Sequence, residues 1–212
     1  MKTFAELAFT PAVRTLQERH GSCAAYARVQ ARAQPGEGLG SREVEHLSGV
    51  DSFYIATVSE TGWPYIQHRG GPRGFLKVLS PTRLAFADFS GNRQFVSVGN
   101  ATRDHRASLI AMDYRNRRRL KLMGRLRFEA IDDADAALAS AVELPAYPAR
   151  IERVGVIDIE AMDWNCPQHI APRFTLADME AAVVPLHDRI RQLEAEVAVC
   201  CKPTSGNPPA TP

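Results

Sequence analysis

Residues 119–129 show the clearest alternation of apolar and polar positions in the chain. Leu120, Leu122, Gly124, Leu126 and Phe128 occupy alternate positions, and arginine, lysine, methionine and glutamate lie between them. Such alternation is typical of an antiparallel strand with one buried face and one solvated face. Shorter runs rich in β-branched and aromatic residues predict further strands at residues 53–58, 65–69, 75–79, 84–87, 108–112 and 154–159.

Helical patterns are fewer than strand patterns. Thr10 and Pro11 are typical of a helix start, and this helix is expected to end at Gly21. Other helices are predicted at residues 41–49, 91–100, 132–142 and 176–199, where Pro185 is expected to kink the last helix or to begin a new one. Two segments lack such patterns, a predicted loop at residues 31–40 and a predicted disordered tail from residue 202 onward.

Six or seven short strands joined by turns favour an antiparallel barrel or sandwich over a βαβ fold. The sequence contains neither a G-x-G-x-x-G motif nor a Walker A motif, so a nucleotide is not expected in a Rossmann crevice.

The composition of the 212 residues, 45% hydrophobic and 24% charged, is that of an ordinary globular protein. A formal net charge of +2 disfavours a dedicated nucleic-acid binder, and no run is long and apolar enough to predict a membrane span. The N-terminus carries Glu6 and no apolar core, so no signal peptide is predicted, and the four cysteines form no disulfide framework. We therefore expect a cytoplasmic protein.

Residues 90–94 are the first candidate for binding chemistry. Ser90 and Gly91 end a predicted strand, and Asn92, Arg93 and Gln94 open the predicted helix. Free N–H groups at a helix start, together with a guanidinium group, can bind a phosphate. The alternative interpretation is an ordinary capped helix with a solvated arginine.

Two other segments are candidates with similar alternatives. Arg69 and Lys77 lie on neighbouring predicted strands and can converge on an anion, or each can lie on a solvated face. Residues 164–169 hold Trp164, Gln168 and His169, which can stack on and hydrogen-bond to a heterocycle, or form a buried loop.

No metal site is predicted, because one C-x-x-H pair without a second pair is insufficient for zinc. Seven basic residues between positions 115 and 127 are interpreted as a solvated or interfacial face rather than an RNA site.

The central block of the chain resembles the FMN-binding split-barrel family related to pyridoxamine 5′-phosphate oxidase, and within it a subgroup of flavin-nucleotide-binding proteins. The resemblance covers roughly residues 40–175 and is carried by residues 51–58, 62–64, 67–72, 74–79, 90–94 and 164–170. It implies a mainly β fold (α+β), a six-stranded antiparallel split β-barrel with flanking helices. It also implies FMN as the cofactor and a homodimer with FMN at the subunit interface.

The resemblance also implies roles for individual residues. Arg69 matches a strand arginine near the flavin phosphate and ring edge, and Lys77 matches the basic residue that follows it. The phosphate is expected to contact Asn92, Arg93 and Gln94, where glutamine replaces a lysine of the oxidase and removes one cation.

The remaining site residues follow from the same resemblance. Gly70 and Ser90 are expected beside the cofactor. Trp164, Gln168 and His169 are expected to shape the pocket of the flavin ring, and His169 is the candidate proton donor, although no catalytic residue is assigned.

The C-terminus departs from the family, because a helix and a proline-rich tail replace the oxidase's arginine-tryptophan substrate motif. Pyridoxamine phosphate oxidation is therefore not expected. The hypothesis is an FMN-dependent oxidoreductase with a small-molecule substrate or electron donor such as NAD(P)H. The alternatives are a non-catalytic FMN binder or carrier, and a split barrel that uses haem or a deazaflavin. No nucleic-acid or membrane partner is expected.

The expected organisation has four parts. Residues 1–40 are predicted to be an N-terminal helical extension and residues 41–175 the FMN-binding split-barrel domain. Residues 176–201 are predicted to be a C-terminal helix and residues 202–212 a disordered tail.

Overall fold

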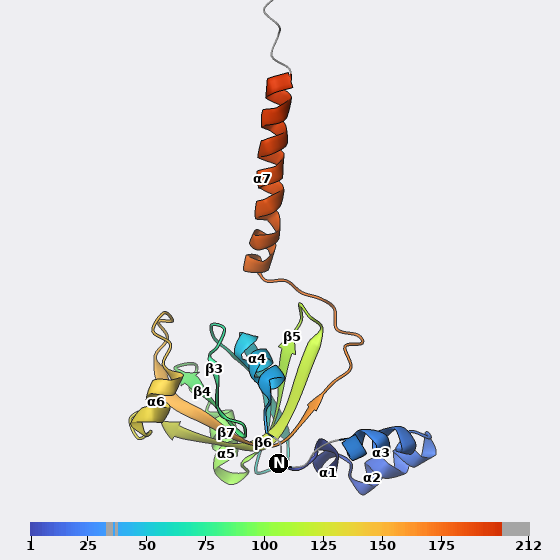
Figure 1. Ribbon diagram of the computed structural model, residues 1–212. Coiled ribbons are helices and arrows are strands. Elements are labelled where there is room, and N and C mark those ends of the chain that lie inside the picture. Colours follow the sequence, from blue (N-terminus) through green and yellow to red (C-terminus); the bar gives the residue numbers. More distant parts are fainter. Residues whose placement is uncertain (33–35, 37, 201–212) are drawn as a thin grey trace, which may run out of the picture. The chain divides into compact units, whose positions relative to one another are not determined.

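Antiparallel strands form the centre of the protein, as the computed structural model shows (Figure 1). The structure describes residues 1–32, 36 and 38–200, and the predicted tail from residue 202 lies outside them. Within these residues one sheet has seven strands: β1 (Ser52–Val58), β2 (Pro64–Gly70), β3 (Leu76–Ser80), β4 (Arg83–Phe89), β5 (Arg106–Asp113), β6 (Arg118–Ala130) and β7 (Ile151–Trp164). The strand predicted from the clearest alternation is β6, and the other predicted runs each fall on one of the remaining strands.

The described helices are α1 (Phe4–Ala8), α2 (Pro11–Arg19), α3 (Cys23–Arg32), α4 (Ser41–Gly49), α5 (Val96–Arg103), α6 (Ala136–Val142) and α7 (Leu176–Cys200). The chain divides into two units, Met1–Ala171 and Pro172–Pro212, and α7 belongs to the second. No helix in the described part of the chain combines the length and the apolar character needed to cross a membrane.

All strand pairs are antiparallel, in the order β2-β1-β5-β6-β7-β4-β3. The expected six-stranded barrel is therefore wrong in its strand number, since the described sheet has seven strands, and β2 and β3 at its edges do not pair with each other. The sheet nevertheless curls strongly. The evidence is an ion pair between Arg69 on β2 and Asp88 on β4, two strands that lie five places apart in the strand order. The edge strand β2 thus meets β4, the neighbour of the other edge strand, through side chains instead of backbone hydrogen bonds.

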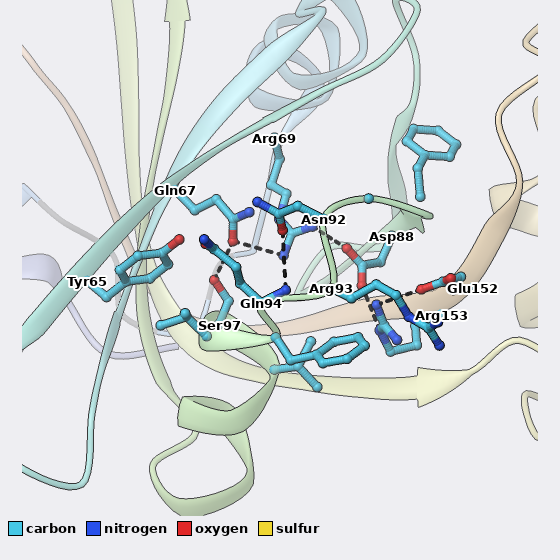
Figure 2. A pocket seen from close by; sticks show the side chains of 15 residues that line it. Tyr65, Gln67, Arg69, Asp88, Asn92, Arg93, Gln94, Ser97, Glu152 and Arg153 are labelled. Carbon is cyan, nitrogen blue, oxygen red and sulfur yellow. Dashed lines mark hydrogen bonds and ion pairs between the residues drawn. The ribbon is translucent and has the colours of Figure 1, made fainter.

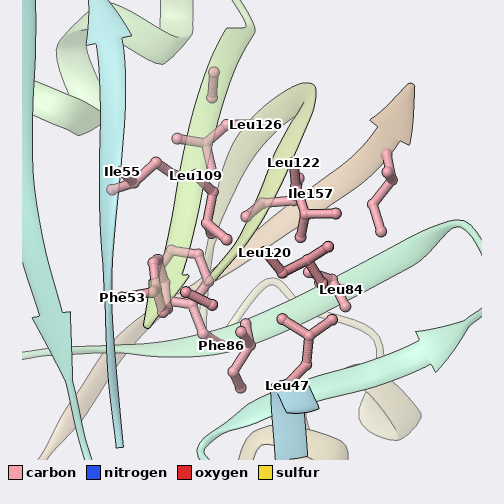
Figure 3. Close-up of a cluster of buried hydrophobic side chains, with 14 of the residues drawn as sticks. Leu47, Phe53, Ile55, Leu84, Phe86, Leu109, Leu120, Leu122, Leu126 and Ile157 are labelled. Atoms are coloured by element: carbon pink, nitrogen blue, oxygen red, sulfur yellow. The ribbon is translucent and has the colours of Figure 1, made fainter. Parts of the chain in front are cut away.

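The concave face of the sheet holds the main core (Figure 3). Leu120, Leu122 and Leu126, which the alternation places on one face of β6, are at most 1% exposed. The glycine in the same series has a steric role, because a Cβ atom at Gly124 would lie 2.3 Å from the carbonyl oxygen of Asp158. The β6–β7 register shifts at this point, so Gly124 allows two long strands to approach closely.

A second apolar cluster lies on the opposite face of β4 and β7. Ala85 and Ala87 of β4 pack there with Val142 of α6 and with Val154 and Val156 of β7. Because successive residues of β4 alternate between the two clusters, each residue of β4 and of its partners can be assigned to one face.

The helices differ from their predicted bounds at several places. Residues 91–95 are a loop, because Arg93 and Phe95 have φ angles of 60° and 55°, in the left-handed region that a right-handed helix cannot use. The helix predicted from residue 132 begins only at Ala136, after Asp135, whose side chain accepts from the N–H of Ala137. The last helix continues through Pro185 without a break, so of the two alternatives, a kink or a new helix at Pro185, the second is wrong.

The N-terminal region also holds helices that the pattern missed. α1 is a short helix whose capping Thr3 accepts a hydrogen bond from the N–H of Glu6. α3 extends to Arg32 and therefore includes the first two residues of the loop predicted at 31–40. The predicted helix after Thr10 is confirmed as α2, with the Thr10 side chain at its cap.

Candidate functional site

A cavity of about 70 Å³ lies where β2, the end of β4, the loop before α5 and the start of β7 meet (Figure 2). Its polar lining residues come from all of these segments: Gln67, Arg69, Asp88, Asn92, Arg93, Gln94, Ser97, Glu152 and Arg153. The curl of the sheet brings these segments together, since β2 and β4 are not neighbours in it.

Arg69 points toward the concave side of the sheet. Its partner on β1 is Phe53, which is fully buried, and directly opposed residues of an antiparallel pair share a face. The Arg69 guanidinium forms an ion pair with Asp88 and donates from Nη2 to Oε1 of Gln67 at 3.2 Å. Its Nε is buried and has no hydrogen-bond partner within the described residues. The wall of the cavity therefore contains a cationic group with an unused donor.

Asp88 is the buried acid that positions two arginines. It lies on the same face of β4 as the core residues Leu84 and Phe86, and its side chain is 3% exposed. One carboxylate oxygen pairs with Arg69, and the other accepts from Nε of Arg153 at 2.7 Å. A carboxylate this buried is stable only when it is paired. Asp88 therefore fixes both guanidinium groups at the cavity.

The loop between β4 and α5 forms another wall of the cavity. Asn92 accepts a hydrogen bond through its side-chain oxygen from the N–H of Gln94 at 3.3 Å. Phe95, at the N-cap of α5, makes no side-chain hydrogen bond to the helix. The N–H groups of the first turn of α5 therefore lack a side-chain cap, and such groups attract anions.

The charges lining the cavity sum to a positive surplus. Arg69, Arg93 and Arg153 face the carboxylates of Asp88 and Glu152, so three cations stand against two anions. Arg153 also pairs with Glu152 at 3.2 Å, whereas Arg93 is exposed and forms no ion pair within the described residues. Arg93 is the cation most available to a ligand.

Four of the residues predicted to bind a cofactor line this cavity: Arg69, Asn92, Arg93 and Gln94. Two others lie next to these in sequence without lining it. Gly70 is the last residue of β2, and Ser90 is exposed and donates its backbone N–H to the carbonyl of Arg150 at 2.8 Å.

Lys77 lies on the other face of the sheet. It pairs with Ala85, which packs in the α6 cluster with Val142, whereas Leu76 and its partner Phe86 belong to the main core. The prediction that Lys77 and Arg69 converge on one anion is therefore not met within one chain, because the alternation of β3 directs Lys77 away from the cavity.

Trp164 is the last residue of β7, and Gln168 and His169 follow it in the chain. Eleven residues along this strand separate Arg153 at the cavity from Trp164, a distance of roughly 35 Å for an extended chain. Trp164 instead contacts α4, where its Nε1 donates to Oε1 of Glu43 at 2.6 Å. The structure does not bring these three residues to the cavity within one chain.

His46 completes the contacts of Trp164 with α4. The two rings meet edge to face with centres 4.9 Å apart, and His46 Nε2 is 3.2 Å from the carbonyl oxygen of Ala111. Burial lowers the pKa of His46 below its ordinary value, and this effect outweighs the hydrogen bond to Ala111 and the nearby Asp113, which raise it. The ring is therefore neutral in the folded protein and donates from Nε2 to the carbonyl.

Acid is expected to destabilise the fold through His46. Because the folded-state pKa lies below the unfolded value of about 6.5, the unfolded chain binds the proton more readily. This contribution to stability is complete above about pH 6.5 and is lost as the pH falls below that value. Urea unfolding measures the free energy of unfolding at about pH 7.5 and at about pH 5.5. The loss between these two pH values should be smaller in His46→Gln than in the unchanged protein. An equal difference in both proteins would contradict the assignment.

Sequence reasoning missed five polar residues of the cavity, namely Gln67, Asp88, Ser97, Glu152 and Arg153. A signal was available for Asp88, because it directly follows the strand predicted at residues 84–87 and has the same parity as Leu84 and Phe86. An acid on an apolar strand face requires a cationic partner. The identity of that partner depends on how the sheet curls, which local pattern does not show.

Comparison with known proteins finds similarity at the level of solved structures. No protein-family model matches the sequence, and no curated protein matches it. One similar structure is HupZ of Group A Streptococcus, with 14% identity, a TM-score of 0.49, and coverage of 64% of this chain and 100% of HupZ.

Two further similar structures come from other bacteria. A Clostridium acetobutylicum protein of the pyridoxinephosphate oxidase family, related to general stress protein 26, has 14% identity, a TM-score of 0.40, and coverage of 63% of this chain and 91% of that one. An FMN-binding protein of Syntrophomonas wolfei has 10% identity, a TM-score of 0.41, and coverage of 58% and 86%. Pyridoxamine 5′-phosphate oxidase-family and FMN-binding proteins are thus among the structures similar to this chain, and this is the family that its sequence motifs resemble.

Proposed function

We propose that the cavity beside Arg69 binds the phosphate end of FMN. The observation that carries this proposal is the convergence of Arg69, Arg93 and Arg153 on one cavity next to the uncapped first turn of α5. Guanidinium groups and free helix N–H groups are the donors that proteins use most for phosphate. Arg93 and Asn92, on the exposed loop, would contact the phosphate directly.

The lining also fits a dianion on electrostatic grounds. The positive surplus of the cavity is a cost that a bound anion would reduce. Arg69 and Arg153 would contribute charge without moving, because Asp88 holds them. Bound FMN would supply the hydride or electron transfer, and the protein would supply binding and orientation.

The volume of the cavity supports a site that is completed by a second copy of the chain. About 70 Å³ is far below the roughly 300–1,000 Å³ of typical small-molecule sites. The convex face of β1 and β2 carries Tyr54 and Ile66, which are 38% and 65% exposed, and Trp63 in the adjoining turn is 76% exposed. Exposed apolar residues grouped in this way indicate a protein contact, and we propose that a homodimer forms there.

A dimer would also give a role to the loop that lies far from the cavity in one chain. Trp164, Gln168 and His169 of a second copy would then approach the flavin ring, with His169 as the candidate proton donor. On this proposal the protein is an oxidoreductase that takes electrons from a small donor such as NAD(P)H.

Binding is tested by titrating the purified protein with FMN and with riboflavin and following the quenching of flavin fluorescence. FMN should bind more tightly than riboflavin, because only FMN carries the phosphate. A visible spectrum of the protein as purified separates a flavin from haem, which shows a Soret band, and from a deazaflavin. Equal affinity for FMN and riboflavin would contradict the phosphate site.

Catalysis is tested separately on FMN-loaded protein. Anaerobic mixing with NADH or NADPH should bleach the flavin faster than the same donor bleaches free FMN. If FMN binds but no common donor reduces it above that background, the protein is an FMN binder or carrier rather than an oxidoreductase.

Replacing Lys77 by alanine is expected to leave the affinity for FMN unchanged. The lysine lies on the α6 face of β3, opposite the cavity, and its charge is screened across the sheet by solvent and salt. The affinity of this variant for FMN is measured by the same fluorescence titration. A loss as large as that expected for Arg93→Ala would instead support the assignment made from sequence.

A further inference from the structure

The helix α7 exposes a continuous apolar stripe. Six residues of the stripe are between 42% and 76% exposed: Leu176, Met179, Leu186, Ile190, Leu193 and Val197. A seventh, Val183, is partly exposed. The helix has 25 residues and is therefore about 37 Å long. A helix with such a stripe is stabilised mainly by the packing of its apolar face.

The stripe has the period of a coiled coil. From Leu176 to Val197 the apolar residues follow one another at intervals of three and four residues without interruption. This spacing assigns Leu176, Val183, Ile190 and Val197 to position a of the heptad and Met179, Leu186 and Leu193 to position d. A seam of this type lies along one side of a helix and fits an identical seam on a second helix.

We propose that α7 pairs with α7 of a second copy of this chain as a parallel, two-stranded coiled coil. The choice of residues supports both the number and the direction of the strands. Position a is β-branched in three of the four heptads, at Val183, Ile190 and Val197, and position d holds leucine at Leu186 and Leu193. β-branched residues at a together with leucine at d favour parallel dimers.

The flanking charges agree with a parallel arrangement. Arg189 occupies position g and Glu194 occupies the following position e, and in a parallel dimer these positions of opposite chains face each other. Arg189 is free for this contact, because its ion pair within the helix, to Glu196, is long at 3.9 Å and more than half exposed. In the proposed dimer, Arg189 of each helix therefore lies opposite Glu194 of the other helix, at the edge of the seam.

Pro185 and the net charge are also consistent with this partner. Pro185 falls at position c, on the side of the helix away from the seam, so its ring does not obstruct pairing. Pairing would offset part of the cost of a proline inside a helix. The helix carries five acidic residues and two arginines, whereas helices that lie on membrane surfaces are rich in lysine and arginine on the polar face.

The inference is independent of the flavin site and of the proposed contact through β1 and β2. It is tested by disulfide cross-linking in the full chain, with Cys23, Cys166, Cys200 and Cys201 replaced by serine. Leu193→Cys places the thiol in the seam, and Ala195→Cys, the matched control, places it at position f on the outer side. Any dimer of the first unit raises the local concentration of both thiols equally, so only the difference between the variants reports on α7.

We expect Leu193→Cys to form disulfide-linked dimers at least about tenfold faster than Ala195→Cys. Equal rates, or no cross-link in either variant, would overturn the proposal. This includes the cases in which α7 packs on its own chain, pairs in an antiparallel manner or binds a membrane surface. Far-ultraviolet circular dichroism of both variants checks that the helix is retained.

A charge exchange gives a second measurement in the Leu193→Cys background. Arg189→Glu should slow the cross-link because it places two acids opposite each other, and adding Glu194→Arg should restore the rate. If the double exchange does not restore the rate, the parallel register is wrong.

Discussion

Replacing Asp88 by alanine is expected to lower the free energy of unfolding by about 3–5 kcal/mol. The Asp88 side chain is 3% exposed and pairs with Arg69 and Arg153, which are themselves only 15% and 20% exposed. Without the carboxylate, the Arg69 guanidinium has no ion-pair partner in the interior, and Arg153 keeps only its pair with Glu152. Urea unfolding followed by circular dichroism measures the loss.

Asp158 provides a matched control for this variant. It also accepts from two arginines, Arg83 at 2.6 Å and Arg127 at 2.7 Å, but its side chain is 41% exposed. Solvent screens both of these pairs, so Asp158→Ala should cost about 1 kcal/mol or less. Similar losses for the two variants would show that burial does not determine the strength of the Asp88 cluster, and the account of how Arg69 and Arg153 are positioned would then be wrong.

Replacing Arg93 by alanine is expected to weaken FMN binding by about 1.5–3 kcal/mol, which corresponds to about 10–150-fold. Arg93 lines the cavity and is exposed on its loop, so its loss removes a charge-assisted contact without disturbing the core. The unfolding free energy should therefore not change. Riboflavin affinity should not change either, because riboflavin lacks the phosphate that Arg93 is proposed to contact.

The control for Arg93→Ala is Arg103→Ala at the other end of α5. Arg103 is 72% exposed, pairs with Glu60 and does not line the cavity, so this variant changes the net charge equally without touching the proposed site. If both variants weaken FMN binding to the same degree, the effect comes from the overall charge. If Arg93→Ala leaves FMN affinity unchanged, Arg93 does not contact the phosphate.

The candidate site was predictable where the information is local. Asn92, Arg93 and Gln94 follow a strand end and a glycine, and Arg69 lies on a strand with a clear pattern, so residue type and neighbours suffice to select them. Lys77 looked equivalent to Arg69, but the face to which it points depends on its pairing with Ala85. The chemistry of Trp164 suggests a place in the site. Within one chain, however, Trp164 lies eleven residues from Arg153 along β7.

The loop before α5 shows how a local pattern can mislead. Gly91 to Gln94 resembles a helix start, yet Arg93 and Phe95 adopt left-handed backbone conformations and the helix begins at Val96. These conformations are unfavourable for residues other than glycine. They persist only because the surrounding fold holds them, so no sequence pattern could indicate them.

The strands and their buried faces follow from the residues alone, because the alternation of residues such as Leu120, Leu122 and Leu126 reflects which side chains can leave water. The last helix, predicted at residues 176–199 and present as α7, also follows from the period of the chain alone. The meeting of β2 and β4, through which Arg69 and Arg153 share Asp88, depends instead on the three-dimensional arrangement of the strands. The curl of a seven-stranded sheet depends on the sum of all strand twists and contacts, so residues far apart in the sequence become neighbours without any local signal.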